Sequence, residues 1–311
     1  MGKNERQWIG LDIGGTNIKA ALIHKDKILK RIQVRTNAEK GKKASLQQIR
    51  SAITQIAGKA GGIGIGIAGI VDSKKGIVRY SPNFKGWNDV PLSSLLRKEF
   101  RIPVSIINDV NAVCLGEWKY GAARGAHNVF CFTLGTGIGG GLIINDNIVF
   151  GAHGFAGEFG HMPINYNGPK CVCGNYGCLE RYVGSRYIIR LFEKLSKNRK
   201  RSTRHSSLTV KAIAQKAKKG DRIAAEVFAE IGYYIGIGVA NVITLLDPEI
   251  VIVAGGISRA GKILFDPIRK TVRKHLLGSQ FRRYRIVPAK LGDDAGIMGA
   301  IHYLKTVIRK Q

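Results

Sequence analysis

The chain has 311 residues, with 50 Lys or Arg against 21 Asp or Glu, and its formal net charge is +29. Hydrophobic residues make up 44% of it, so the chain is apolar and long enough to form one large domain or two ordinary ones. Its 40 glycines follow no collagen period and its prolines number only 8, which excludes collagen-like and low-complexity proteins. The excess of basic residues favours the binding of polyanions, but these residues are spread along the chain. The one dense run, 197–205, is typical of a solvated loop between helices.

The five cysteines indicate a reducing compartment. They are too few for a disulfide framework, and three of them lie between residues 171 and 178, which suggests a metal site. The N-terminal residues show no apolar segment of a secretory signal. The longest uncharged apolar run, 231–246, has 16 residues, fewer than the roughly 20 that span a bilayer. Its GxxxG pair, Gly232 and Gly236, therefore favours a buried helix of a soluble protein, and we expect a cytoplasmic protein that binds no membrane.

The first half of the chain predicts a mixed sheet with helices packed against it. Alternating apolar residues bounded by turn residues mark the strands, and apolar residues at helical spacing mark the helices. The expected elements are strands at 7–13, 17–24 and 27–34, a helix at 43–58, an apolar segment at 63–71, a helix at 91–99 and a strand at 103–107.

The pattern of a strand, a glycine turn and a second strand recurs in the second half. A strand at 128–134 leads into a glycine-rich turn and a strand at 141–145. A long helix begins at Asp221 and ends before Pro248, because the residue preceding a proline is unfavourable in a helix. A buried strand at 249–256 and a final helix from about 294 follow. The repeat suggests a duplicated domain with a cleft between the copies.

Three glycine-rich turns are candidates for binding phosphate groups. In DIGGTN (12–17), backbone amides and the Thr16 hydroxyl can donate to a phosphate, and the Asp12 carboxylate can hold a hydrated Mg²⁺. An ordinary hairpin turn explains this motif equally well. GTGIGG (135–140) matches the dinucleotide-binding pattern, but a strand follows it instead of a helix, so we interpret it as a second phosphate turn that faces the first. AGG (254–256) offers a third contact.

Polar residues in apolar surroundings are further candidates. Asn108 and Asp109 follow a predicted strand and open a helix, where a helix N-cap is the simpler explanation. Glu158 and His161 lie in a glycine-rich loop whose apolar neighbours predict partial burial. Glu180 follows the cysteine cluster.

Cys171, Cys173 and Cys178 form a candidate zinc site with His161. Three thiolates and one imidazole make a closed tetrahedral Zn²⁺ site of the structural type. Their C-x-C-x₄-C spacing is not a common zinc-finger spacing, so simple core packing remains an alternative. The other two cysteines lie in apolar segments and are expected in the core.

Taken together, these segments resemble the ROK family of sugar kinases and repressors, and within it the bacterial glucokinases. The resemblance covers nearly the whole chain and rests on GLDIGGTNIK (10–19), SPNFKGW (81–87), INDVNAV (107–113), LGTGIGGG (134–141), GEFGH (157–161), CVCGNYGCLE (171–180), VAGGIS (253–258) and GDDAGIMGA (292–300). It implies an α/β fold of the actin-like ATPase type, with two ribonuclease H-like domains around a cleft. The small domain would comprise residues 1–108 and 295–311, and the large domain, with the zinc-binding loop, residues 109–294.

The resemblance also implies roles for single residues. Asp109 would be the general base that takes the proton from the sugar hydroxyl as it attacks the γ-phosphate of ATP. The sugar would be bound by Gly69, Asn83, Asn108, Asp109, Glu158, His161 and Glu180. ATP would be bound by Asp12, Gly14, Gly15, Thr16, Asn17, Lys19, Thr136, Gly137, Gly255 and Gly256. His161 would hold a structural Zn²⁺ with one ring nitrogen and face the sugar with the other.

The expected activity is the ATP-dependent phosphorylation of the 6-hydroxyl of a hexose, with catalytic Mg²⁺, most simply glucose to glucose 6-phosphate in glycolysis. A kinase for N-acylmannosamine or N-acetylglucosamine is an alternative. A repressor of the same family is disfavoured, because only six residues precede the first strand and leave no room for a helix-turn-helix. We expect a homodimer or a higher homo-oligomer and no specific binding of nucleic acid. The sugar, the oligomeric state and the use of polyphosphate in place of ATP stay open at this point.

Overall fold

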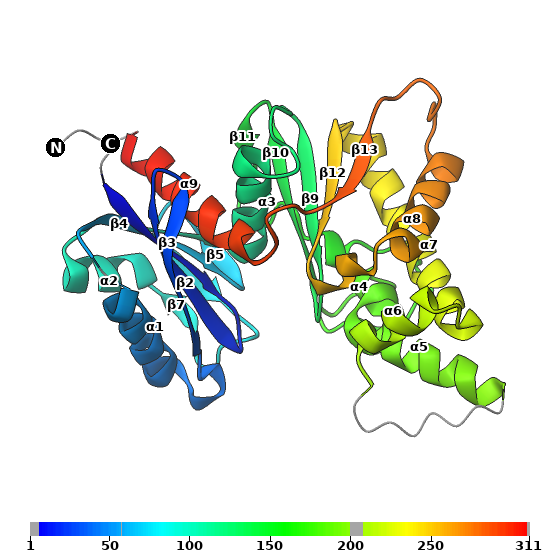
Figure 1. The fold of residues 1–311 in the computed structure, drawn as a ribbon, viewed down its shortest axis with the longest axis horizontal. Coiled ribbons are helices and arrows are strands. Elements are labelled where there is room, and N and C mark those ends of the chain that lie inside the picture. The colour runs from blue at the N-terminus through cyan, green and yellow to red at the C-terminus, as the bar shows by residue number, and fades with distance from the viewer. Residues whose placement is uncertain (1–5, 57, 200–207, 310–311) are drawn as a thin grey trace. The chain divides into compact units, whose positions relative to one another are not determined.

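The computed structural model of the chain describes residues 6–56, 58–199 and 208–309. The chain divides into two compact units, each built from a sheet and helices (Figure 1). The first unit comprises Met1–Gly125, Gly141–Ala156 and Lys290–Gln311, and the second comprises Ala126–Gly140 and Gly157–Ala289.

The first unit is built on a five-stranded sheet with the order β3-β2-β1-β4-β8. These strands are β1 (Gln7–Ile13), β2 (Asn17–His24), β3 (Lys27–Arg35), β4 (Ala60–Ile67) and β8 (Val104–Asn108). β1, β2 and β3 form an antiparallel meander, while β4 and β8 run parallel to β1. Lys25 and Asp26 have positive φ angles of 48° and 61°, which suits a two-residue hairpin turn between β2 and β3.

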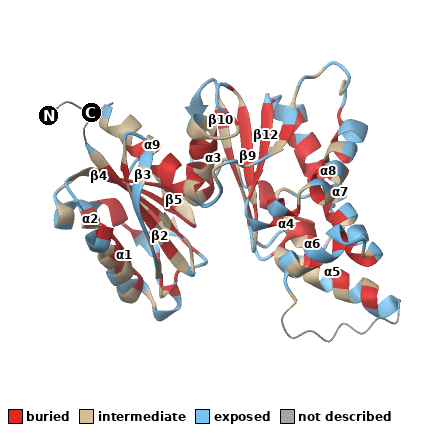
Figure 2. Ribbon diagram, viewed as in Figure 1, coloured by how far each residue is buried: buried red, intermediate tan, exposed pale blue. Residues whose placement is uncertain are grey.

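Helices cover both faces of this sheet, because successive side chains of β1 point into two different apolar layers. The helices are α1 (Lys42–Ile56), α2 (Leu92–Phe100), α3 (Asp109–Tyr120) and α9 (Ala295–Arg309). Leu11 and Ile13 of β1 share one layer with the buried residues of α1 and α2. Trp8 shares the other layer with Ile297 and Ile301 of α9. Figure 2 shows the buried residues concentrated on the strands and on the helix faces turned toward them.

The apolar segment expected at 63–71 is divided between β4 and a second, three-stranded sheet. That antiparallel sheet consists of β5 (Ile70–Asp72), β6 (Ile77–Tyr80) and β7 (Asn88–Val90), in this order. The division falls at Gly69, whose φ of 131° is a backbone conformation that other residues rarely adopt.

The molecule has another five-stranded sheet, with the order β11-β10-β9-β12-β13. Its strands are β9 (Val129–Leu134), β10 (Ile138–Ile144), β11 (Asn147–Ile148), β12 (Ile250–Ala254) and β13 (Arg285–Pro288). β9, β12 and β13 are parallel, and every residue of β12 is buried, as expected for a parallel strand covered on both faces. The boundary between the two units falls within β10, after Gly140.

The second unit contains most of the remaining helices. They are α4 (Glu180–Val183), α5 (Ser185–Asn198), α6 (Val210–Lys218), α7 (Arg222–Leu246) and α8 (Lys262–His275), with the short 3₁₀ helices η2 (Phe159–His161) and η3 (Gly256–Ala260); η1 (Ala38–Lys40) and η4 (Gly292–Asp294) belong to the first unit. Asp221 caps α7, because its carboxylate accepts a hydrogen bond of 3.0 Å from the Ala224 N–H. Residues 200–205 of the basic run expected as a loop lie outside the described residues.

α7 is long and apolar enough to cross a membrane by length and composition, but half of its most apolar window is buried inside the protein. The helix packs against α8. A Cβ on Gly232 would lie 2.6 Å from the Pro267 Cβ, and one on Gly236 would lie 2.5 Å from the Thr271 Cβ. The GxxxG pair therefore lets two helices of one unit approach closely, and we interpret α7 as a core helix.

The limits of the first unit differ from those expected for the small domain. The structure adds residues 109–125, which include α3, and the segments 141–156 and 290–294 to it. The physical reason is the contact between α3 and α9, whose backbones meet where glycines replace side chains. A Cβ on Gly116 of α3 would collide with the carbonyl of Ala295, so α3 cannot be separated from α9 without opening this contact.

Glu117 joins α3 to the segment that precedes α9. Its side chain is completely buried, and its carboxylate accepts hydrogen bonds from the N–H groups of Ala122 (2.8 Å), Lys290 (3.0 Å) and Leu291 (2.7 Å). A buried carboxylate is costly unless its oxygens have donors, and these three N–H groups supply them. Glu117 therefore fixes the position at which the chain enters α9.

We expect Glu117→Gln to lower the free energy of unfolding by about 2–4 kcal/mol, because the new amide NH₂ would face backbone donors and leave buried groups unpaired. The matched control is Glu99→Gln. Glu99 forms an exposed ion pair with Arg50, of a kind that contributes less than about 1 kcal/mol. Urea unfolding of the two variants measures the difference, and equal losses would contradict the role given to Glu117.

Candidate functional site

The candidate residues of the first unit lie around one edge of its sheet. β1, β4 and β8 are parallel, and their register places Ile13 beside Ile67 and Ile67 beside Asn108. The three strands therefore end at the same level, where they lead into the first glycine turn, the segment after β4 and Asp109. The carboxyl ends of parallel strands are the usual ligand-binding edge of α/β proteins.

The first glycine turn, residues 14–16, is held by the segment that follows β3. The carbonyl of Gly14 accepts a hydrogen bond of 2.7 Å from the Thr36 hydroxyl. Asn83 lies against the turn, since a Cβ on Gly15 would be 3.0 Å from the Asn83 Cβ. The structure thus brings a turn predicted to bind phosphate and Asn83, which is predicted to bind the sugar, together within one unit.

The loop that carries Asn83 is also fixed to the segment after β4. The Ser81 hydroxyl donates a hydrogen bond of 2.7 Å to the carbonyl of Ala68. A Cβ on Gly69 would lie 2.5 Å from the carbonyl oxygen of Tyr80, so the two segments approach closely only because residue 69 is glycine.

Asp12, the last acidic residue before the glycine turn, has a pKa raised to about 6. Burial is the main cause, the nearby Asp109 carboxylate adds to it, and the Lys19 ammonium opposes it. Lys19 stands opposite Asp12 in the β1–β2 pair and forms an ion pair of 3.2 Å with Asp293, whose charge also raises the pKa of Asp12. Two neighbouring carboxylates, Asp12 and Asp109, make this part of the site attractive to a cation.

Asp109 is the first residue of α3, and Asn108 is the residue that caps the helix. Oδ1 of Asn108 accepts hydrogen bonds from the N–H groups of Val110 (2.9 Å) and Asn111 (3.0 Å). Nδ2 of Asn108 donates to Oδ1 of Asp109 (3.0 Å) and to the carbonyl of Gly69 (3.1 Å). The N-cap explanation therefore applies to Asn108, while Asp109 is held in orientation by it.

In the second unit, the glycine turn between β9 and β10 lies beside the turn after β12. β9 and β12 are parallel, with Thr133 opposite Ala254, so both turns leave the sheet at the same edge. Gly255 has a φ of 85° and packs on the carbonyl of Leu134, where a Cβ would collide. A cavity of about 600 Å³ opens at these turns, with Thr136 and Gly256 in its lining.

Most of the lining of this cavity comes from residues that belong to no motif in the sequence. It includes Ser185 and Ile189 of α5, Leu208, Thr209, Lys211 and Gln215 at α6, and Arg259 and Ala260 of η3. Apolar walls with a few polar groups in a cavity of this size suit a nucleoside. The sequence signal of α6 is its helical periodicity, which marks a helix and says nothing of a ligand.

The loop with Glu158 and His161 is anchored in the core by Phe159. Its ring packs against those of Phe130 and Phe132, with centroids 5.0 and 4.9 Å apart. Glu158, just before it, is exposed, and His161 is half-buried. Phe159 therefore anchors the loop, and the predicted partial burial is confirmed for His161 but not for Glu158, whose side chain is exposed.

Glu180, the first residue of α4, is bound to the second glycine turn. Its Oε2 accepts a hydrogen bond of 2.8 Å from the N–H of Ile138. A Cβ on Gly137 would lie 3.0 Å from the same oxygen. A residue predicted to bind the sugar and a residue predicted to bind a phosphate are thus neighbours in this unit as well.

His161, Cys171, Cys173 and Cys178 form one cluster, with all four ligand atoms within 4.8 Å of one another. The Sγ atoms of Cys173 and Cys178 are 3.7 Å apart, and Sγ of Cys171 is 3.7 Å from Nδ1 of His161. Zn–S bonds of about 2.3 Å place tetrahedral ligand atoms about 3.8 Å apart, so the spacing fits this ion.

The cluster brings three thiols so close together that a bound cation would balance the negative charge of their thiolate forms. Burial raises the pKa of Cys178 to about 12, and the neighbouring Cys173 and Cys171 add to the shift. The pKa of Cys173 is instead lowered, mainly by a backbone hydrogen bond from Asn175. A bound cation would offset the burial of one thiolate and the repulsion among all three.

The structure groups the predicted residues by unit. The first unit holds Asp12, Gly14, Gly15, Thr16, Asn17, Lys19, Gly69, Asn83, Asn108 and Asp109, and the second holds Thr136, Gly137, Glu158, His161, Cys171, Cys173, Cys178, Glu180, Gly255 and Gly256. Each unit therefore carries a glycine turn together with part of the predicted sugar-binding set.

Comparison with known proteins places these sites in a family. The ROK family model matches residues 8–307. The chain is 40% identical to a glucokinase of Thermotoga maritima over 96% of both proteins. It resembles the crystal structure of a ROK family glucokinase from Streptomyces griseus in complex with glucose and AMPPNP, with a TM-score of 0.85 and 34% identity over 96% of this chain and 99% of that one. It also resembles a ROK hexokinase from Thermus thermophilus, with a TM-score of 0.82 and 28% identity over 98% of this chain and 100% of that one. The fold is the actin-like ATPase fold of these kinases, and the chain belongs to the ROK family.

Proposed function

We propose that this chain is an ATP-dependent hexose kinase that transfers the γ-phosphate of ATP to the 6-hydroxyl of glucose. The observation that carries the proposal is the position of Asp109. It follows the carboxyl end of β8, level with the first glycine turn, and Asn108 orients its carboxylate. The similarity to glucokinases, one of them solved with glucose and an ATP analogue, supports the choice of substrates.

Asp109 is the general base in this proposal. Its carboxylate accepts the proton of the 6-hydroxyl as the hydroxyl oxygen attacks the γ-phosphorus and ADP leaves. Oδ1 of Asp109 already accepts hydrogen bonds from Asn108 and from the N–H of Val110, both 3.0 Å long, which fixes the plane of the carboxylate. Positioning of this kind supplies much of the acceleration in phosphoryl transfer.

Asp12 is proposed to hold the Mg²⁺ that accompanies the nucleotide. Its buried carboxylate, next to a second one at Asp109, fits a hard cation with oxygen ligands. When bound, the ion neutralises charge on the phosphates. The backbone amides of the two glycine turns bind the phosphates, and Lys19 contributes a positive charge beside the first turn.

The nucleoside of ATP is proposed to occupy the cavity of about 600 Å³ in the second unit. Thr136 and Gly256 connect this cavity to the glycine turns of the unit, which suits a nucleotide whose phosphates extend from the cavity to those turns.

The sugar hydroxyls are proposed to bind Asn83 in the first unit and Glu158, His161 and Glu180 in the second. Gly69 and Asn108 are proposed to shape this site. Asn108 acts mainly through Asp109, because its amide already serves the helix cap, the Gly69 carbonyl and the Asp109 carboxylate.

The cluster at Cys171, Cys173 and Cys178 is proposed to hold one structural Zn²⁺ together with His161. Nδ1 of His161 faces Cys171, which leaves Nε2 for a sugar hydroxyl. Four protein ligands leave no position for an activated water, so the ion would act by joining the loop of Glu158 to the segment of Glu180. The five free thiols agree with the expected cytoplasmic location.

A coupled kinase assay with ATP and either glucose, mannose, N-acetylglucosamine or N-acetylmannosamine tests the proposed function. The highest kcat/KM is expected with glucose. A preference for an amino sugar would assign the alternative substrate class, and no turnover of any sugar would overturn the proposal.

The first prediction concerns Asp109. Asp109→Asn keeps the size of the side chain but cannot accept the proton, so kcat should fall by about 100-fold or more while KM for glucose changes little. Asp89→Asn is the matched control, because Asp89 forms an exposed ion pair with Arg79 in the same unit. Steady-state kinetics measures both variants, and a kcat near that of the wild type in Asp109→Asn would show that Asp109 is not the base.

The second prediction concerns zinc. Metal analysis of the purified protein should find one Zn²⁺ per chain. Cys173→Ser should lose the ion, raise KM for the sugar by about tenfold and more than KM for ATP, and lower Tm. Cys114→Ala, at a buried cysteine outside the cluster, should retain the zinc. Full activity in a zinc-free enzyme would disprove the structural role of the cluster.

The third prediction concerns Asp12 and pH. The native pKa of about 6 lies above that of an unfolded aspartate, so the native state binds more protons between about pH 4 and 6. The free energy of unfolding therefore falls as pH rises through this window and stays low above it. Asp12→Asn removes this loss, and without Mg²⁺ or nucleotide it should stabilise the protein at pH 7.5 by up to about 3 kcal/mol, with little gain at pH 4.

Asp72→Asn is the control for this experiment, because the pKa of Asp72 is shifted in the opposite direction to that of Asp12. A backbone hydrogen bond from Lys75 is the main cause that lowers the pKa of Asp72, so its charge stabilises the native state above its unfolded pKa. Removing it should not stabilise the protein at pH 7.5. Urea unfolding at several pH values measures both variants, and a pH-independent effect of Asp12→Asn would contradict the raised pKa.

A further inference from the structure

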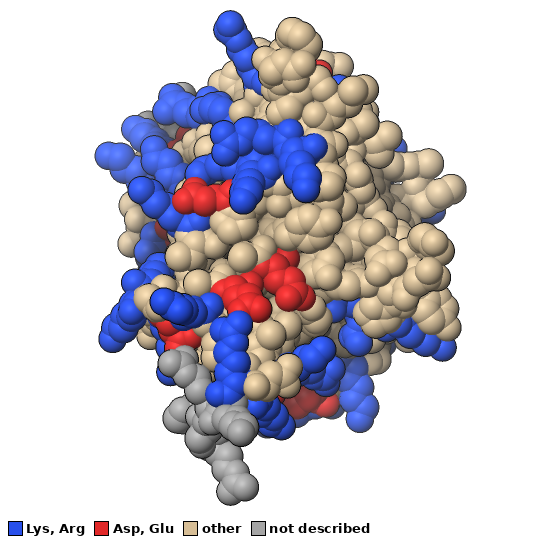
Figure 3. All heavy atoms as spheres, turned by 90° about the vertical axis from the view of Figure 1, so that its right-hand side faces the viewer, with Lys and Arg blue, Asp and Glu red and all other residues tan. Residues whose placement is uncertain are grey.

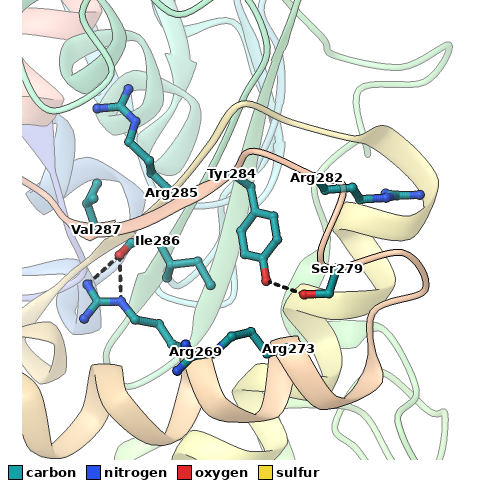
Figure 4. Close-up of a pocket in the computed structure, with 8 residues that line it drawn as sticks. All are labelled: Arg269, Arg273, Ser279, Arg282, Tyr284, Arg285, Ile286 and Val287. Carbon is teal, nitrogen blue, oxygen red and sulfur yellow. Dashed lines mark hydrogen bonds between the residues drawn. The ribbon is translucent and has the colours of Figure 1, made fainter.

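The second unit has another pocket, outside the proposed active site, between α8, β13 and the segment that joins them. Its volume is about 460 Å³, and its polar lining consists of Arg269, Arg273, Ser279, Arg282, Tyr284 and Arg285. Figure 4 shows Tyr284 between Arg282 and Arg285, which extend to either side of it, while Arg269 and Arg273 rise from α8 below. Among the described residues, no acidic side chain lines this arginine pocket.

The arginine pocket lies in a strongly basic part of the described chain. Residues 262–290 contain nine Lys or Arg and one acidic residue, Asp266, a net charge of +8 in 29 residues. Figure 3 shows Lys and Arg side chains gathered in the upper part of the side of the molecule on which α8 lies in Figure 1. Such a concentration of one sign of charge raises the local concentration of anions.

Two of the four arginines are held in place by the backbone. Nε and Nη2 of Arg269 donate to the carbonyl of Ile286, at 3.3 and 2.7 Å. Nη1 of Arg282 donates to the carbonyl of Ile243, at 2.9 Å. A guanidinium that is already ordered loses less entropy when it binds a ligand.

The other two arginines keep all their donors available. Arg273 on α8 and Arg285 at the start of β13 are exposed, and neither guanidinium has a hydrogen bond or an ion pair with any described residue. The hydroxyls of Ser279 and Tyr284, 3.4 Å apart, add two more donors inside the pocket. The lining is therefore rich in donors that prefer an anionic acceptor.

Two carboxylates near the arginine pocket oppose this charge only in part. Asp266 is 3.5 Å from Nη1 of Arg269, and Asp247 is 3.1 Å from Nη1 of Arg282. Both carboxylates are largely exposed, with 64% and 72% of their side-chain surface accessible, so water screens these ion pairs strongly. The pocket itself keeps an uncompensated positive charge.

We propose that the arginine pocket is a binding site for a small, multivalent phosphate-bearing anion. A volume of about 460 Å³ admits a small molecule, and balancing four guanidinium groups in it requires several negative charges close together. Each phosphate group carries about −1.5 to −2 at neutral pH, and its oxygens match the planar donor fork of arginine. None of the lining residues belongs to the proposed kinase site, so the proposal does not depend on the proposed function.

The test is binding of inorganic tripolyphosphate, measured by isothermal titration calorimetry on the full chain. The test variant is Arg273→Ala/Arg285→Ala, since neither guanidinium has a hydrogen bond or ion pair with a described residue that the substitution would remove. The control is Lys43→Ala/Lys98→Ala, which removes the same charge from exposed positions on α1 and α2. We expect the Kd of tripolyphosphate to rise at least about tenfold in the test variant and to change less than about twofold in the control.

Citrate, a multivalent carboxylate, provides the second arm and should bind at least about tenfold more weakly than tripolyphosphate. Equal binding of tripolyphosphate by the wild type and the test variant would overturn the proposal, as would no binding by the wild type. Binding of citrate as tight as that of tripolyphosphate would overturn the assignment to phosphate. Kinase activity should be unchanged in the test variant, so failure of this proposal and failure of the proposed function are measured separately.

Discussion

The close approach of α9 to the first sheet and to α3 is the constraint on which the first half of the site depends. Gly10 of β1 and Gly64 of β4 leave no side chain between the strands and α9, and Gly116 of α3 and Gly299 of α9 do the same between the two helices. At each of these positions a Cβ would collide with the helix that packs against it. The backbone of α9 is therefore seated directly on the sheet.

This seating determines the surroundings of Asp12. Gly296, in the first turn of α9, lies against the Asp12 carboxyl group, with its Cβ position 3.2 Å from Cγ. Asp293, just before α9, reaches Lys19 on the neighbouring strand. Burial raises the pKa of Asp12, and the Asp109 and Asp293 carboxylates add to the shift while Lys19 opposes it. The proposed Mg²⁺ site therefore depends on helix packing as much as on the glycine turn.

The two units use the same device to form a site. In each, parallel strands end at one level, and a hairpin turn rich in glycine begins at that level. In the second unit the site also depends on α7, because Gly238 lets this helix approach Phe159 and Leu179. Phe159 follows Glu158 and Leu179 precedes Glu180, and both acidic residues are predicted to bind the sugar. Core packing and site geometry are therefore coupled in both units.

Local sequence patterns were sufficient to predict the elements that carry the motifs. The hairpin of β1 and β2, the capped start of α7 and the cysteine cluster each have a signal within a few residues, in alternation, capping or spacing. β6 and β7 are too short to show a period. The placement of α3 with α9, and the cavity lined by α5 and α6, arise from contacts between distant segments, for which a single sequence carries no local signal.

The order of segments along the chain has a consequence for protein synthesis. The strands of the first unit emerge from the ribosome early, but α9, which covers Trp8 and Ile23, follows the second unit in the chain. The whole second unit is translated before α9 becomes available. One apolar face of the first sheet therefore remains uncovered until the second unit has been translated, and the nascent chain has to be protected from aggregation over that interval.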